Sequence, residues 1–269
     1  MHKYKGLLIV TEGPDGSGKG AMDSGFEAVL EKYNLRLFNA VEFQKKNRDH
    51  PQFDRPTFKD GKKDELYVNL SQHSAISVAQ PSYAWAGTAI RRELLENSKA
   101  YSAIEIAQAY ADDRLVLDKR VIMPALEQGK LVLESRNVLS SLTYQPIDAD
   151  LKGEYLTREQ VLNLVGNKFE VHEVVPDLLV ICDITEEQAA DNLKQKGHLD
   201  NFELDSELQR RVISAYKEPE LLELFTKCGT ELARIEYDSD LSVKQKCAAD
   251  ILEDFLKSKG FLKNHAAMA

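Results

Sequence analysis

The sequence predicts a three-layer α/β fold in which a five-stranded parallel sheet is flanked by helices. The main observation is that short apolar runs alternate with longer segments whose apolar residues recur at helical spacing, as is typical of a parallel sheet covered by helices. The second is a glycine-rich turn directly after the first apolar run. The chain has 269 residues, enough to bury a substantial core, and we interpret residues 1–269 as a single domain.

Five short apolar runs are predicted to be the strands. They are Leu7–Glu12, Ala75–Gln80, Leu131–Glu134, Leu178–Asp183 and Leu232–Tyr237. We expect the first of them to lie in the middle of the sheet. Since open α/β sheets bind ligands at the carboxyl ends of their strands, residues that follow these runs are the candidates for a binding site.

Helices are predicted between the strands. Met22, Phe26 and Leu30 recur at helical spacing after the glycine-rich turn. A long helix over residues 102–128 should end at Gly129, a residue type that favours the left-handed conformation just past a helix. Pro124 should kink or shorten this helix, because proline removes a backbone hydrogen bond.

Two later helices should begin at capping boxes, in which a hydroxyl side chain and a glutamine three residues later each bond the other's backbone N–H. Thr185 with Gln188 forms one, and Ser242 with Gln245 forms the other. Residues 39–74 interrupt the alternation, since connections in α/β units are usually about 2–6 residues long. They could be a lid-like insertion, an oligomer contact or a loop without function. Residues 264–269 are expected to form a frayed tail.

The glycine-rich turn is the strongest functional signal. It reads Gly13-Pro14-Asp15-Gly16-Ser17-Gly18-Lys19-Gly20. Gly-x-x-x-x-Gly-Lys between a strand and a helix is the phosphate-binding P-loop, in which backbone N–H groups and the helix N-terminus face phosphate oxygens and the lysine reaches the β- and γ-phosphates. We therefore expect these residues to bind ATP. The alternative is a glycine-rich turn that binds nothing, but such a turn has no need of the lysine.

The residue after the lysine departs from the P-loop pattern. A serine or threonine normally supplies a hydroxyl to Mg²⁺ there, but this chain has Gly20 and then Ala21. Mg²⁺ is well satisfied by phosphate oxygens and water. We expect it to be held mainly by the ATP phosphates and water, with a carboxylate reached from Glu134 or Asp15, and we assign no residue as a direct metal ligand.

Composition excludes several classes of function. The net charge of −9 and a pI near 5.3 argue against a surface that binds nucleic acid. The three cysteines lack CxxC spacing and the six histidines do not pair at ligand spacing, so we expect reduced thiols and no histidine-bound metal. The apolar runs are only a few residues long, which predicts no membrane segment and a cytoplasmic protein.

Further segments follow the P-loop in a recognisable order. They are Gln80-Pro81-Ser82-Tyr83 with Gly87-Thr88-Ala89-Ile90-Arg91, Tyr110-Ala111-Asp112-Asp113-Arg114, Glu134-Ser135-Arg136-Asn137, Ser140-Ser141-Leu142-Thr143-Tyr144-Gln145, and a charged loop that begins at Lys194-Gln195-Lys196. Together they resemble the thymidylate kinase family, which has Glu-Pro and Gly…Ile-Arg, Phe-Ala-Ala-Asp-Arg, Asp-Arg-Tyr or Asp-Arg-His, Ser…Tyr-Gln and a basic lid at these places. The resemblance covers nearly the whole chain except residues 39–74 and the tail.

The resemblance implies an ATP-dependent kinase for a deoxynucleoside monophosphate, with dTMP as the default acceptor. Phosphoryl transfer needs cations from several directions, because its transition state requires charge neutralisation and alignment rather than covalent help. By resemblance, Lys19 holds the donor, Arg91 and Arg136 contact the acceptor monophosphate, and Arg114 orients the acceptor near its base. A homodimer is implied as well.

The resemblance also assigns residues that surround the acceptor or cover the donor. The residues expected at the acceptor are Pro81, Tyr110, Tyr144 and Gln145, with Tyr110 stacking on the pyrimidine. Asp15 resembles the loop carboxylate that meets the acceptor sugar hydroxyl. Lys194 and Lys196 would close over the donor as cations of a lid at about residues 194–206. The expected catalytic residues are therefore Lys19, Arg136, Asp15, Lys194 and Lys196.

The chain departs from the family pattern at several of these positions. Gln80 replaces a glutamate, Ser135 replaces an acidic residue, and Asn201 replaces the lid arginine, in addition to the change at Gly20. Removing a cation aimed at the transition state costs about 10³–10⁵ in rate. Two functions therefore stay open: a kinase, and a nucleotide-binding pseudoenzyme of the same fold with weak or no kinase activity. The preferred base stays open too.

Overall fold

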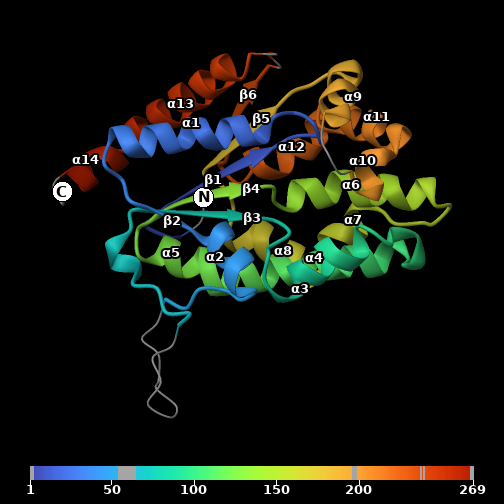
Figure 1. The fold of residues 1–269 in the computed structure, drawn as a ribbon, viewed down its shortest axis with the longest axis horizontal. Coiled ribbons are helices and arrows are strands. Elements are labelled where there is room, and N and C mark those ends of the chain that lie inside the picture. The colour runs from blue at the N-terminus through green and yellow to red at the C-terminus, as the bar shows by residue number, and fades with distance from the viewer. Residues whose placement is uncertain (1–2, 54–64, 196–198, 237, 239, 267–269) are drawn as a thin grey trace, which may run out of the picture.

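The computed structural model describes residues 3–53, 65–195, 199–236, 238 and 240–266. Its centre is a parallel sheet with the strand order β2-β3-β4-β1-β5-β6 (Figure 1). The strands are β1 (Leu7–Glu12), β2 (Leu37–Asn39), β3 (Ala75–Ala79), β4 (Leu131–Ser135), β5 (Leu178–Cys182) and β6 (Glu231–Ile235). The α/β class and the interior position of β1 are thus confirmed.

The expected number of five strands is wrong, because β2 adds a sixth strand at the edge beside β3. This strand has only three residues and none of them is buried, so no apolar run marked it. The segment expected to be an irregular connection over residues 39–74 in fact starts with the end of β2 and with helix α2 (Ala40–Asn47). Its residues 54–64 lie outside the described part of the chain.

Helices cover both faces of the sheet and make the three layers. One face carries α1 (Lys19–Lys32), α13 (Leu241–Ser258) and α14 (Phe261–Ala266), and Figure 1 shows α1 and α13 packed side by side on it. The opposite face carries α4 (Ala103–Leu117), α5 (Met123–Glu127), α6 (Val138–Leu151), α8 (Val165–Glu173), α11 (Ser206–Ala215) and α12 (Pro219–Thr226). The remaining helices are α3 (Trp85–Ala89), α7 (Arg158–Leu162), α9 (Glu186–Lys194) and α10 (Asn201–Leu204).

Strand β4 illustrates how the two cores are separated. Leu131 and Leu133 belong to the core beneath α1 and α13, whereas Val132 belongs to the core beneath α4 and α6. Successive strand side chains point to opposite faces, so Glu134 faces the same side as Val132. A carboxylate therefore lies 1% exposed in the second core.

The long helix predicted over residues 102–128 is present, with a change of geometry in the middle. A wider π-helical turn over Asp118–Ile122 joins α4 to α5, and the N–H of Met123 bonds the carbonyl of Asp118 five residues earlier. Pro124 follows directly, at the start of α5. A wider turn suits this position because proline has no N–H to donate and its ring would clash with a carbonyl in a regular helix. Gly129 ends the helix with φ +75°, as predicted.

The helix caps are confirmed in one case and wrong in the other. Thr185 and Gln188 form the expected capping box at the start of α9. The expected box of Ser242 and Gln245 is wrong: Asp240 caps α13 by accepting a hydrogen bond from the N–H of Ser242. An aspartate is at least as good an acceptor there as a serine, and it lies two residues earlier. At the C-terminus, α14 extends into the residues expected to form the tail. None of the helices in the described ranges is long and apolar enough to cross a membrane.

Candidate functional site

A cleft of about 340 Å³ opens at the carboxyl edge of the sheet, and most of the residues predicted from the sequence line it. Those lining it are Asp15, Lys19, Pro81, Arg91, Tyr110, Arg114, Arg136, Tyr144 and Gln145. They come from the P-loop, from the segment after β3, from α4, from the turn after β4 and from the middle of α6. The topology therefore gathers at one cleft residues that are more than a hundred positions apart in the chain.

The P-loop has the backbone conformation that its glycines were expected to allow. Gly13, Gly16 and Gly18 have φ values of +146°, +75° and +86°, which residues with a side chain rarely adopt. A Cβ on Gly18 would lie 2.7 Å from Nζ of Lys244. Gly20 differs from these three, because a Cβ there meets no atom within 4 Å. The missing side chain at position 20 is thus not a steric requirement of the loop.

Three side chains that the sequence did not indicate hold the P-loop from behind. Nζ of Lys244 on α13 donates to the Ser17 carbonyl at 2.7 Å, and Sγ of Cys182 lies 2.8 Å from the same oxygen. Nδ2 of Asn192 on α9 donates to the Gly16 carbonyl at 2.7 Å. These bonds satisfy the carbonyl groups of Gly16 and Ser17 and fix the back of the loop. No local pattern could have revealed them, since the partners lie at least 165 residues away in sequence.

Lys19 is partly buried and lies across the backbone of the loop. Its Nζ donates to the carbonyl oxygens of Gly13 at 2.9 Å and Pro14 at 2.8 Å. Burial and the nearby charge of Arg136 lower the pKa of Lys19 to about 8, against the opposing effect of Asp15. The ammonium is thus poorly compensated, and a polyphosphate would supply the negative charge that it lacks.

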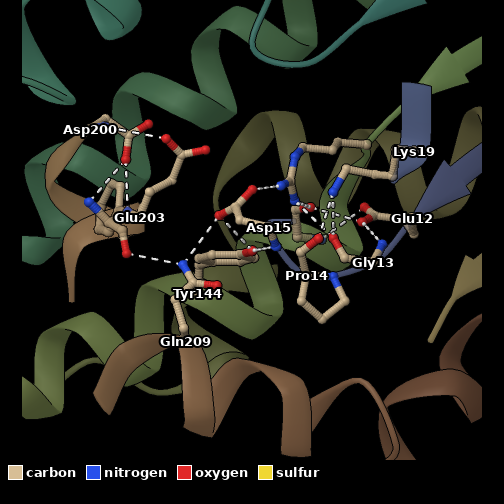
Figure 2. A network of polar contacts seen from close by, with 12 residues as sticks. Glu12, Gly13, Pro14, Asp15, Lys19, Tyr144, Asp200, Glu203 and Gln209 are labelled. Carbon is tan, nitrogen blue, oxygen red and sulfur yellow. Dashed lines mark hydrogen bonds and ion pairs between the residues drawn. The ribbon is translucent and has the colours of Figure 1, made fainter. Parts of the chain in front are cut away.

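Arg136 and Asp15 form an ion pair across the mouth of the loop, as Figure 2 shows around the labelled Asp15. Arg136 also donates to Oγ of Ser140 at 2.9 Å. The Tyr144 hydroxyl donates to Oδ2 of Asp15 at 2.9 Å and accepts from the Asp15 N–H at 3.1 Å. Burial alone would raise the pKa of Asp15, but the charges of Arg136 and Lys19 outweigh it and hold that pKa below its usual value. Asp15 is therefore an anion that orients Arg136.

Glu12, at the end of β1, was not singled out from the sequence and connects the P-loop to α6. Its buried carboxylate accepts from the N–H groups of Gly13 at 3.2 Å, Asn137 at 2.8 Å and Ser140 at 3.1 Å. It also accepts from the hydroxyls of Ser140 at 2.9 Å and Tyr216 at 2.7 Å. A negative charge at the N-terminus of a helix is favourable. Glu12 thus sets the position of α6 relative to the loop.

Arg91 lies on the opposite wall of the cleft and is held by backbone oxygens. Its Nε donates to the carbonyls of Pro81 and Ser82, both at 3.1 Å, and its guanidinium carbon lies 3.9 Å from the ring centre of Tyr83. The N–H of Tyr83 in turn donates to Oε1 of Gln44 on α2 at 3.2 Å. One part of the segment over residues 39–74 therefore supports the cleft wall.

Arg114 is the most buried of the predicted cations, with 2% of its surface exposed. Its Nε lies 2.7 Å from Oε1 of Gln80 and 2.8 Å from Oε2 of Glu170, and another nitrogen donates to Oγ of Ser141 at 3.0 Å. Gln145 donates to the same Ser141 oxygen at 3.2 Å. Arg114 thus reaches the cleft as part of a fixed wall.

The structure differs most from the sequence-based predictions at the lid residues. Lys194 points away from the cleft: its side chain is 74% exposed and pairs with Asp191 at 2.9 Å on the same helix. Lys196 lies outside the described residues. The cleft is instead lined by Asp200, Phe202 and Glu203, and Gln209 joins this segment to the loop by donating to Oδ2 of Asp15 at 3.3 Å and to the Phe202 carbonyl at 3.0 Å (Figure 2).

Glu134, one of the two residues from which a carboxylate was expected to reach Mg²⁺, does not extend toward the donor side of the cleft. It is buried on the opposite face of the sheet from α1, where its Oε1 accepts from Nε2 of Gln80 at 2.7 Å. Burial and the neighbouring carboxylates of Glu170 and Asp118 raise its pKa well above the usual value. A further carboxylate near the loop, not indicated by the sequence, is that of Asp23 on α1. Burial raises the pKa of Asp23 to about 6, against the opposing charge of Lys19 and a hydrogen bond from Thr11.

Comparisons with known proteins agree with this geometry. The family model described as thymidylate kinase matches residues 65–227. A thymidylate kinase of Finegoldia magna is 32% identical over 218 residues, which cover 79% of this chain and 83% of the relative. Another, of Exiguobacterium sp., is 26% identical over 263 residues, which cover 96% and 99%.

A solved structure supports the fold as well. The thymidylate kinase from Candida albicans matches with a TM-score of 0.60 and covers 96% of this chain and 93% of its own. Sequence identity in this match is only 16%, so it bears on the fold alone.

Proposed function

The chain belongs to the thymidylate kinase family, and from this premise we propose that its cleft transfers the γ-phosphoryl group of ATP to dTMP. The observation that carries the proposal is that Lys19 on the P-loop and Arg136 in the turn between β4 and α6 line the same cleft. Their charges act on each other and on Asp15. The expected donor cation and the expected acceptor cation thus lie in one cleft, and Asp15 of the P-loop is a neighbouring anion of both.

In the proposed mechanism, the residues neutralise and align two anions. Lys19 leaves the Gly13 and Pro14 carbonyls and binds the β- and γ-phosphates, while the loop N–H groups bind the remaining oxygens. Arg136, held by Asp15, binds the acceptor phosphate and brings it in line with the γ-phosphorus. Arg91 contacts the acceptor phosphate as well, and Tyr110 stacks on the base. Asp200 and Glu203 cover the cleft and exclude water that would otherwise hydrolyse ATP.

The residues near the loop fit an Mg²⁺ ion that is carried by ATP. Gly20 offers no side-chain oxygen, and Asp15 is already paired with Arg136. Asp23, three residues after Gly20 on α1, is a half-buried carboxylate near Lys19, and its burial raises its pKa to about 6. We propose that Asp23 holds the hydrated ion through its water ligands. When bound, Mg²⁺ supplies charge neutralisation at the β- and γ-phosphates.

A coupled ADP-release assay tests the proposed function. ATP is offered with dTMP, dUMP, dCMP, dAMP, dGMP or no acceptor, and Lys19→Met serves as the matched control because it keeps the length of the side chain without its charge. We expect ADP release that depends on dTMP and is lost in the control. The proposal fails if ATP binds but no monophosphate increases ADP release, which is the behaviour of the pseudoenzyme.

Two further proposals accompany this function and concern the oligomeric state and the location of the protein. We propose a homodimer in the cytoplasm, on the family resemblance and on the lack of membrane-spanning helices among the described residues. Light scattering of the purified chain measures its mass directly. A single chain of 30.4 kDa in solution would contradict the dimer.

A further inference from the structure

Three buried carboxylates lie together behind the cleft. Asp118 comes from the π-helical turn between α4 and α5, Glu134 from β4 and Glu170 from α8. One oxygen from each lies within 4.8 Å of the others, and the three side chains are 0–1% exposed. Carboxylates repel one another, and burial strengthens the repulsion. Such a group needs a compensating positive charge or protons.

Three carboxylate oxygens of the cluster have no hydrogen-bond donor among the described residues. Neither carboxylate oxygen of Asp118 has a hydrogen-bond partner within the described ranges, and Oε2 of Glu134 has none either. Buried polar atoms in native proteins are nearly always satisfied. The other oxygens have partners: Gln80 donates to Oε1 of Glu134 at 2.7 Å and to Oε1 of Glu170 at 3.1 Å, and the N–H of Val138 donates to Oε2 of Glu170 at 2.9 Å. The unsatisfied oxygens therefore belong to Asp118 and Glu134.

Arg114 compensates only part of the charge. Its Nε pairs with Oε2 of Glu170 at 2.8 Å. If all three carboxylates are ionised, these four side chains carry two negative charges in excess, which a single divalent cation would neutralise. We propose that Asp118, Glu134 and Glu170 bind a divalent cation that prefers oxygen ligands, at a site separate from the P-loop.

The spacing and the chemistry define the class of ion. Ca²⁺ binds oxygens at about 2.3–2.6 Å, so ligands on opposite sides of the ion are about 4.6–5.2 Å apart. The three oxygens lie within 4.8 Å of one another, so they are no farther apart than ligands of one Ca²⁺ ion can be, and separations of about 4 Å would suit Mg²⁺. Three carboxylates without histidine or cysteine favour Ca²⁺, Mg²⁺ or Mn²⁺ over zinc or copper.

The position of the cluster ties the ion to the cleft wall. Gln80 lines the cleft and donates to both Glu134 and Glu170, and Oε1 of the same side chain accepts from Arg114 at 2.7 Å. The proposed ion site therefore lies behind the side chain of Gln80, which itself faces the proposed acceptor site. By fixing Glu134 and Glu170 it would fix the orientation of Gln80 and Arg114.

Metal binding to the nucleotide-free full-length chain tests the proposal, and it does not depend on the proposed kinase function. The chelator-treated chain is titrated with Mn²⁺, followed by the paramagnetic resonance signal of free Mn²⁺, and then with Ca²⁺ as a competitor. We expect one Mn²⁺ per chain, displaced by Ca²⁺, and a rise in Tm on binding. Wild-type chain that takes up neither ion overturns the proposal, whatever its kinase activity.

Variants locate the ion. Asp118→Asn keeps the shape of the side chain and removes one charge, and we expect it to weaken Mn²⁺ binding by at least about tenfold, the loss that even outer-shell changes cause. Glu134→Gln is the second variant, and it keeps an oxygen for the Gln80 bond in case Asp118→Asn does not fold. Asp112→Asn, at an exposed carboxylate on α4 outside the cluster, is the matched control and should leave Mn²⁺ binding unchanged. Retained Mn²⁺ binding in both cluster variants would show that the ion binds elsewhere and would overturn the proposal. Variants that are more stable than a wild type whose Tm is indifferent to metal would show that protons occupy the cluster instead.

Discussion

Replacing Gly20 by threonine should strengthen the binding of ATP with Mg²⁺ and leave the binding of ATP alone nearly unchanged. The position can take the side chain, because a Cβ on Gly20 meets no atom within 4 Å. It is the second residue of α1, directly after Lys19. A hydroxyl there would reach the metal that the β- and γ-phosphates carry.

The magnitude follows from two contributions. Threonine in place of glycine favours the first turn of α1 by a few tenths of a kcal/mol, since glycine costs about 1 kcal/mol and ordinary residues at most about 0.7. The hydroxyl contributes as a bond to a charged group does, about 1.5–3 kcal/mol. Water otherwise fills the same position, so we expect the lower value, which is roughly a tenfold gain in affinity at about 1.4 kcal/mol per factor of ten.

Calorimetric titration with ATP, with and without Mg²⁺, measures this gain. Gly20→Val is the control, because valine has nearly the shape of threonine and a similar effect on the helix but no hydroxyl. The threonine variant should exceed the valine variant only when Mg²⁺ is present. If the two variants bind MgATP equally, the hydroxyl is not what this loop lacks, and the reasoning from the P-loop pattern is refuted.

Three further predictions concern the cleft. Arg136→Ala should abolish phosphoryl transfer, with a loss of about 10³ or more in rate, while ATP binding measured by calorimetry stays within several-fold; turnover of dTMP at the wild-type rate would contradict this. Tyr110→Ala should raise the KM for dTMP more than it lowers kcat, by roughly 1–3 kcal/mol of lost stacking, and an unchanged KM would remove Tyr110 from the acceptor site. ATP affinity should fall as the pH rises through about 8, because the free Lys19 ammonium loses its proton there and only the charged form holds phosphates. Arg136→Ala should move this fall to higher pH, since Arg136 lowers the pKa of Lys19.

Much of the fold was predictable because the signals for it are local. Buried parallel strands appear as apolar runs, and each of the five predicted strands corresponds to an observed one within two residues. Strand β2 escaped because three partly exposed residues carry no such pattern. The cap of α13 was misplaced because Asp240 and Ser242 both suit an N-cap, and only the path of the chain decides between them.

The site was predictable where a motif fixes both spacing and geometry, as in the P-loop. It was not predictable where contacts join distant segments. Glu12 bonds Asn137 and Tyr216, which are 125 and 204 residues away, and a single glutamate at the end of a strand gives no sign of this. Lys194 was predicted to be a lid cation because it is a basic residue in a charged segment. In the structure it forms an ion pair with Asp191 on the same helix.

The cluster of three buried carboxylates explains the departure from the family pattern at Gln80. Where the family has glutamate, the amide of Gln80 donates to Glu134 and Glu170 and its oxygen accepts from Arg114. A glutamate at this position would keep the acceptor but lose both donated bonds, and it would add a fourth carboxylate to three that already repel one another. Gln80 is therefore compatible with Glu134 in a way that glutamate is not. The change at position 80 preserves the orientation of Arg114 toward the cleft rather than weakening it.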